Sequence, residues 1–299
     1  MDIKKYSFSQ KSTSYYFHAA FSALETLVDR SHAVIITDEN IFAPQPCSRE
    51  TVLLTHEEAY LNKLIHQHLS AREQRVIGFP QSPALTQREL IIAQGTIDGC
   101  MYAMENGVAM NIAGGTHHAF KNRGEGFCML NDQAIASNYL LNNNLAKKIL
   151  IIDLDVHQGN GTAKLFEHEP NVFTFSMHGK NNYPFHKEKS DLDVELLDGT
   201  NDEIYLQLLR DTLPALIEKV QPDMAFYLAG VDILETDKFG KLKVTMNGCK
   251  QRDEFVFTQL KQNNIPCQTS MGGGYSADVK IITDAHCNTF RLAKDIWNL

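Results

Sequence analysis

The feature that most constrains the fold of this chain is a regular alternation of helical and strand patterns from residue 89 onward. Such alternation is typical of a parallel sheet with helices on both faces, so we expect an α/β fold. The expected strands are 108–112, 147–153, 172–176, 223–230 and 266–270. The expected helices are 88–104, 132–143, 161–168, 202–220, 252–263 and 276–297.

The first 88 residues are harder to assign. Segments 33–37 and 51–56 could be strands, and segment 57–69 could be a helix. No repeat, low-complexity segment or Gly/Ser/Pro linker interrupts the chain, and its one long loop-rich stretch is 178–202. We therefore predict a single domain over residues 1–299, a length that a large α/β domain can reach.

The composition argues against several classes of protein. No apolar run approaches the roughly 20 residues of a membrane span, and the N-terminal segment lacks the apolar core of a secretory signal, so we expect a cytoplasmic protein. The formal net charge of −8 argues against nucleic acid as a partner, because such binding needs clustered Lys and Arg. The six cysteines form no CxxC pair, which argues against disulfides and a cysteine zinc site.

Polar or glycine-rich turns follow the carboxyl ends of all five expected strands. In an open parallel sheet, the ligand crevice lies outside these ends. The turns can therefore form one site although they are distant in the sequence. They are AGGTHHAF (113–120), IDLDVHQGNG (152–161), MHG (177–179), GVDILETD (230–237) and MGGGYS (271–276).

The turn at 152–161 carries a pattern that favours a metal. Asp153, Asp155 and His157 follow an apolar run and share one face if the strand continues through them. A single Asp at a strand end usually caps a helix or meets solvent, but this buried group needs a cation or partner to offset desolvation. Asp232, after another strand, could supply a third ligand. Three protein ligands and a vacant position are typical of catalytic zinc.

Two adjacent histidines and a tyrosine occur in turns at the same edge. His117 and His118 follow Gly114 and Gly115, which let the backbone bend, and the pair could supply a base and an acid beside a metal. Tyr275, after three glycines, could donate a hydrogen bond to a developing oxyanion. The single histidines that we expect to be ordinary core residues are His56, His68 and His286.

Four blocks of the sequence resemble the signature blocks of the zinc-dependent histone deacetylase family, in the arginase/deacetylase superfamily. The DVHQGNG variant and segment 55–64 are most similar to the class IV branch and its bacterial relatives. The resemblance implies the arginase/deacetylase fold, an eight-stranded parallel sheet flanked by helices. The blocks are GGTHHAFKNRGEGFCMLND (114–132), IDLDVHQGNG (152–161), AGVDILETDKFG (229–240) and GGGYS (272–276).

The resemblance also implies two bound ions. Asp155, His157 and Asp232 would hold Zn²⁺, or Fe²⁺ in its place. A structural potassium ion would bind nearby, partly through backbone carbonyls. The residues implied for potassium are Asp153, Asp155, His157, Ser176 and Met177.

Catalytic roles follow from the same resemblance. His118 would be the general base that activates the metal-bound water and then protonates the departing amine. His117 would be its electrostatic companion, oriented by Asp153, and Tyr275 would polarise the scissile carbonyl. Many relatives pair the base with an Asp where this chain has Asn160. A neutral amide should stabilise the imidazolium of His118 less, so Asn160→Asp is expected to move the acid limb of the pH–rate profile upward.

An apolar tunnel for the acyl-lysine stem is implied as well, whose methylenes would each gain roughly 0.8 kcal/mol on burial. Gly126 and Phe127 match one wall, and Tyr183 or Phe185 the opposite wall. Phe239 would lie near the rim. Many family members grip the substrate backbone with an aspartate, but segment 77–85, which occupies about that region, contains no acid.

The sequence thus predicts a zinc hydrolase that removes acyl groups, acetyl or longer, from lysine side chains. An alternative substrate on the same site is an acetylpolyamine or another small acylated amine. A dinuclear manganese hydrolase of the arginase type shares the fold but needs further bridging aspartates. A different class of protein, a catalytically silent acyl-lysine reader, would bind such peptides without turnover.

Overall fold

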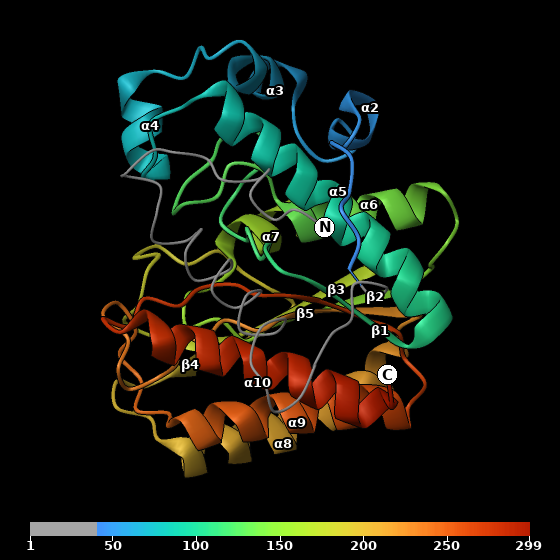
Figure 1. Cartoon of the computed structure of the whole chain (residues 1–299), viewed down its shortest axis with the longest axis vertical. Helices are drawn as coiled ribbons and strands as arrows, with labels where there is room; N and C mark the ends of the chain where they lie inside the picture. Colours follow the sequence, from blue (N-terminus) through green and yellow to red (C-terminus); the bar gives the residue numbers. More distant parts are fainter. Residues whose placement is uncertain (1–40) are drawn as a thin grey trace.

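A computed structural model describes residues 41–299 and contains a parallel sheet between two layers of helices (Figure 1). The strands of the described residues follow the order β1-β6-β5-β2-β3-β4, and every neighbouring pair is parallel. The strands are β1 (Val108–Asn111), β2 (Ile149–Asp153), β3 (Val172–Gly179), β4 (Leu192–Leu196), β5 (Met224–Leu228) and β6 (Cys267–Ser270).

Helices cover both faces of the sheet. In the view of Figure 1, α8 (Asp202–Val220), α9 (Met246–Gln262) and α10 (Val279–Trp297) lie below it. The layer above the sheet consists of α2 (Arg49–Val52), α3 (Glu58–Ile65), α4 (Ala71–Ile77), α5 (Pro83–Asn106), α6 (Asp132–Asn142) and α7 (Asn160–Phe166). The alternation in the sequence correctly predicted this arrangement.

Strand β2 separates the two halves of the core. Ile149 and Ile151 belong to the apolar cluster of the upper helical layer, whereas Leu150 and Ile152 belong to the cluster of α8, α9 and α10. Successive side chains of a strand point to opposite faces, so a strand covered on both sides must be apolar throughout. All residues of β2 are buried, including Asp153 at its carboxyl end.

Three expectations about strands need correction. The sheet of the described residues has six strands, whereas the family resemblance implied eight. Segment 51–56 is not a strand, because Ser48 caps α2 by accepting a hydrogen bond from Thr51 N and the chain then turns. The loop expected at 178–202 contains β4, whose pattern is too polar to stand out as a strand. The possible strand at 33–37 lies outside the described residues.

Side-chain caps explain where two helices begin. Helix α5 begins at Pro83, five residues before the expected start, because Ser82 accepts a hydrogen bond from Leu85 N and proline suits the first turn. Helix α9 begins at Met246, six residues before the expected start, because Thr245 accepts a hydrogen bond from Gly248 N.

Within residues 41–299, no helix is both long and apolar enough to cross a bilayer. The cysteines at 47, 100, 128, 249, 267 and 287 are all free and buried.

Candidate active site

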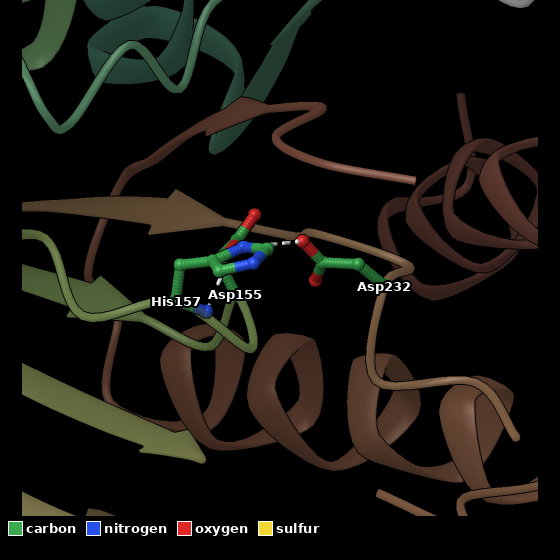
Figure 2. Close-up of side chains that lie close together, drawn as sticks. All are labelled: Asp155, His157 and Asp232. Carbon is green, nitrogen blue, oxygen red and sulfur yellow. Dashed lines mark hydrogen bonds and ion pairs between the residues drawn. The ribbon is translucent and has the colours of Figure 1, made fainter. Parts of the chain in front are cut away.

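The three residues predicted to hold zinc meet at the carboxyl edge of the sheet (Figure 2). Asp155 and His157 lie in the turn after β2, and Asp232 lies in the turn after the neighbouring strand β5. His157 Nδ1 is 3.0 Å from Asp155 Oδ1 and 3.1 Å from Asp232 Oδ2. One possible ligand atom from each residue lies within 4.8 Å of the others, and all three side chains are buried. This group could hold a metal ion.

The chemistry of the group fits a cation. His157 Nδ1 can donate only one hydrogen, so it cannot satisfy the carboxylates of both Asp155 and Asp232. Burial raises the pKa of Asp232 to about 8, and the charge of Asp155 adds to the effect. Burial alone would lower the pKa of His157, but the carboxylates of Asp155 and Asp232 beside Nδ1 raise it to about 10. A bound cation would displace the protons that this group otherwise retains.

The turn after β2 brings these side chains together in a way the strand periodicity did not predict. The strand ends at Asp153 and does not continue to His157. The carboxylates hold the turn instead: Asp155 N donates to Asp153 Oδ1 at 3.2 Å, and His157 N donates to Asp155 Oδ1 at 2.9 Å. Asp153, Asp155 and His157 therefore come from one short segment, which hydrogen bonds within the turn hold in place.

His117 and His118 lie beside the metal-binding group, in the turn after β1. Their ring centroids are 4.1 Å apart, and both side chains are buried. His117 Nδ1 lies 2.7 Å from Asp153 Oδ2, and His118 Nδ1 lies 2.7 Å from Asn160 Oδ1. Asp153 and Asn160 are thus the partners of the two histidines, as the resemblance implied.

The different partners push the two imidazoles toward different protonation states. Burial lowers the pKa of His118 far below its usual value, and the neighbouring His117 and His157 lower it further. Burial would also lower the pKa of His117, but the charge and hydrogen bond of Asp153 raise it overall. A neutral His118 can accept a proton, while a charged His117 can stabilise a negative charge beside it.

Tyr275 reaches the site on a glycine turn that admits no side chain in place of Gly273. A Cβ on Gly273 would lie 2.2 Å from Asp232 Oδ2, and Gly273 N donates to Asp155 Oδ2 at 2.8 Å. Tyr275 N donates to Asp237 Oδ2 at 2.6 Å. The Tyr275 ring lies 6.2 Å from the His157 ring, between centroids, which places the tyrosine next to the metal-binding group.

A cavity of about 120 Å³ opens over these residues. Gly126 and Phe127, the residues predicted for one wall of the tunnel, line it together with Phe79 and Tyr275. The Phe127 ring lies 5.3 Å from that of Phe79 and 6.3 Å from that of Tyr275. The rest of the lining includes both histidines of the pair, Asp155, His157, Arg88 and the glycines at 114, 115, 272, 273 and 274.

The other predicted tunnel residues lie outside the lining of this cavity. Tyr183 packs edge-on against His118, with ring centroids 5.0 Å apart. Phe239 is 54% exposed and contacts the Tyr275 ring at 5.0 Å, which suits a rim position. Phe185 is 87% exposed and lies 6.5 Å from the Tyr183 ring. The structure therefore brings Tyr183 to His118 and leaves Phe185 at the surface.

The residues implied for potassium are close to one another, but no ion-binding role is tested for them. Asp153 pairs with Ser176 across β2 and β3, and Met177 follows on β3. Ser176 Oγ lies 3.0 Å from His178 Nδ1. The potassium ion stays a prediction.

Of the histidines expected in the core, two are buried. His56 is satisfied, with Nδ1 3.0 Å from Phe120 O and Nε2 accepting from Asn131 N at 3.0 Å. Burial lowers the pKa of His286 to about 3, but this residue also lines the cavity from α10, which the expectation missed. His68 is exposed, so the expectation that it lies in the core was wrong.

Sequence reasoning missed three acids that support the site. Asp132 Oδ1 accepts from Thr116 N and fixes the turn that carries the histidine pair. Asp237 holds Tyr275 N, as described above. Glu125 Oε1 accepts a hydrogen bond from Asn160 Nδ2 at 2.6 Å. All three acids lie inside the signature blocks, so an acid among the glycines of a strand-end turn was the available signal.

Comparisons with known proteins agree with this fold. The family described as "Histone deacetylase domain" matches residues 17–290. An uncharacterized protein of Picosynechococcus sp. is 42% identical, over 88% of this chain and 88% of its own length. Histone deacetylase 2 of Arabidopsis thaliana is 32% identical, over 86% of this chain and 69% of its own length. Crystal structures of an HDAC homolog from Aquifex aeolicus and of an HDAC homolog complexed with SAHA give TM-scores of 0.76 and 0.77, each at 23% identity, over 99% of this chain and 86% of theirs.

These matches cover most of the chain at substantial identity, and the structural neighbours share its α/β architecture. The chain belongs to the histone deacetylase family. Family membership supports a deacetylase activity in general. The more specific class IV-like assignment is not tested by these comparisons and stays a prediction.

Proposed function

We propose that this protein is a zinc-dependent amidohydrolase that removes acyl groups from lysine side chains. The observation that carries the proposal is the buried Asp155, His157 and Asp232 group, two members of which line one cavity together with His118 and Tyr275. When bound there, zinc would supply Lewis-acid polarisation of an amide carbonyl and would lower the pKa of water next to it. Ferrous iron would suit the same ligands.

His118 is the proposed general base and acid. Its Nδ1 faces Asn160 Oδ1 at 2.7 Å, so Nδ1 carries the hydrogen and Nε2 is the nitrogen that can accept a proton. Nε2 takes a proton from water as the water oxygen attacks the carbonyl carbon. The same nitrogen returns the proton to the amine nitrogen as the C–N bond breaks, which leaves a carboxylic acid and a free amine.

His117 and Tyr275 stabilise the charge that develops during this attack. The carbonyl oxygen becomes an oxyanion, and a donor already held in place costs no reorganisation in the transition state. The Tyr275 hydroxyl is the proposed donor, since Asp237 anchors its backbone next to the metal-binding group. A protonated His117, hydrogen-bonded to Asp153, would favour the same anionic state.

An acylated lysine is the proposed substrate. Phe127 and Gly126 offer an apolar wall to the methylene stem, and the net charge of −8 is compatible with a lysine-bearing partner. A related fold is known in complex with SAHA, and we expect this chain to bind SAHA in the same cavity. We further propose one catalytic domain over residues 1–299, acting in the cytoplasm with a structural potassium ion.

The test is turnover of acyl-lysine peptides from acetyl to myristoyl, and of an acetylpolyamine, by the zinc-loaded protein. Release of free lysine that disappears on chelation and returns with zinc supports the proposal. His118→Ala is the matched variant, because it should abolish turnover while leaving bound zinc unchanged. Turnover of the acetylpolyamine alone would show that the substrate is a small acylated amine and not acyl-lysine. Binding of an acetyl-lysine peptide without turnover would reject the proposed hydrolase activity.

A further inference from the structure

Glu125 joins two parts of the candidate site through one carboxylate oxygen. Its Oε1 accepts a hydrogen bond from Asn160 Nδ2 at 2.6 Å and another from the Tyr183 hydroxyl at 3.0 Å. The side chain is only 14% exposed, and Arg123 Nε lies 3.5 Å from Oε2. The residue is fixed from its backbone side as well, because Cys128 N donates to Glu125 O at 2.9 Å.

The first of these hydrogen bonds determines which way the Asn160 amide points. With Nδ2 turned to the Glu125 carboxylate, Oδ1 must face His118 Nδ1, as observed at 2.7 Å. A flipped amide would place its carbonyl oxygen against the carboxylate and two acceptors would repel. Because Oδ1 can only accept, His118 must carry its hydrogen on Nδ1. The carboxylate therefore fixes the tautomer of His118 through the amide of Asn160.

The second hydrogen bond fixes the surroundings of the same imidazole. The Tyr183 ring contacts His118 edge-on, and Gly126 fills the remaining space between them. A Cβ on Gly126 would lie 2.6 Å from His118 Cδ2 and 3.0 Å from Tyr183 Cε1. This packing leaves the imidazole little room to rotate while Tyr183 stays bonded to Glu125.

We propose that Glu125 is a positioning residue that selects the productive tautomer of His118 through Asn160 and holds Tyr183 against the imidazole. The catalytic importance of this arrangement rests on the proposed function, in which His118 Nε2 moves the proton. The arrangement also places the Glu125 carboxylate behind Asn160, the neutral amide that contacts His118 directly. No residue of the zinc group takes part in it.

The experiment compares Glu125→Ala and Glu125→Gln in the full-length zinc-loaded protein, with the exposed Glu167→Ala as a matched control. Glutamine keeps an oxygen that accepts from Asn160 and Tyr183, whereas alanine removes it. We expect Glu125→Ala to lower kcat on an acetyl-lysine peptide by about 10- to 100-fold, with unchanged zinc content and Tm. Glu125→Gln should stay within about threefold of wild type.

A second readout separates this proposal from the proposed function. Imidazole ¹⁵N chemical shifts report the tautomer of His118 whether or not the protein turns over a peptide. We expect hydrogen on Nδ1 in wild type and Glu125→Gln, and a mixture of tautomers in Glu125→Ala. An unchanged tautomer in Glu125→Ala, equal kcat losses in both variants, or a loss explained by lower Tm would overturn the role of Glu125. Inactive wild type with the expected shifts would reject only the function.

Discussion

Asn160→Asp, which would restore the acidic partner found in many relatives, should leave the acid limb of the pH–rate profile almost unchanged. This replaces the upward shift expected from the sequence alone, because the sequence did not place Glu125 beside Asn160. The new carboxylate would face Glu125 Oε1 at the 2.6 Å now spanned by Asn160 Nδ2. Two charges at that distance repel by roughly 6 kcal/mol at an effective dielectric constant of about 20. This corresponds to about 4 to 5 pKa units, enough to keep one proton on the pair at neutral pH.

This retained proton explains why the pKa of His118 should stay nearly the same in the Asn160→Asp variant. If the introduced aspartate carries this proton, it would donate to Glu125 Oε1 as the amide does. The double variant Asn160→Asp with Glu125→Gln removes the competing charge. Its single carboxylate would contact His118 directly and should raise the pKa of the imidazole by about one unit.

The assay is kcat/KM for an acetyl-lysine peptide between about pH 5 and about pH 9, for wild type and both variants. A higher pKa of His118 moves the acid limb to higher pH, because the base must lose its proton to act. We expect a shift below about 0.5 unit for Asn160→Asp and an upward shift of about one unit for the double variant. If Asn160→Asp alone moves the limb as far as the double variant, the argument from Glu125 is wrong.

Three further outcomes are expected. The Tm of the metal-free protein should fall as pH rises from about 6 to about 9. In the folded protein Asp232 and His157 keep their protons up to pKa values of about 8 and 10, whereas the unfolded chain releases them near 3.8 and 6.5. A Tm that is flat or rises with pH would contradict this. Phe185→Ala should change the free energy of unfolding by less than about 0.5 kcal/mol and raise KM for acyl-lysine peptides, whereas an unchanged KM would remove Phe185 from the substrate surface. Arg252→Met should cost about 3 to 5 kcal/mol in urea unfolding, since it leaves the fully buried Asp253 without its 2.8 Å ion pair, and a loss below about 1 kcal/mol would argue against that pairing.

The alternation of helix and strand patterns predicted the layered fold because it reports burial directly. Strand β2 is covered on both faces, so its apolar run is hard to mistake. In the sheet formed by residues 41–299, strand β4 pairs with β3 alone, and its partly exposed residues carry no comparable signal. Helix α2 was mistaken for a strand because four residues are too few to show a helical period.

The candidate site was more predictable than the sheet, since its residues come from blocks with unusual chemistry. Asp155, His157 and Asp232 come together as predicted, and so do the histidine pair, Asp153, Asn160 and Tyr275. The sequence showed an acid among the glycines of the first block, but it did not say that the Glu125 side chain points to Asn160 and Tyr183. It likewise did not say that the Phe185 side chain points to solvent.

The most direct test of the account is a zinc titration of the metal-free protein, with bound zinc and acetyl-lysine turnover measured at each step. The site offers one group of three buried ligands among the described residues, so turnover should rise in proportion to bound zinc and reach its plateau at one ion per chain. The Asp232→Asn variant should neither bind the ion tightly nor turn over. A plateau at two ions, or full turnover in the metal-free protein, would contradict the proposed mononuclear zinc hydrolase.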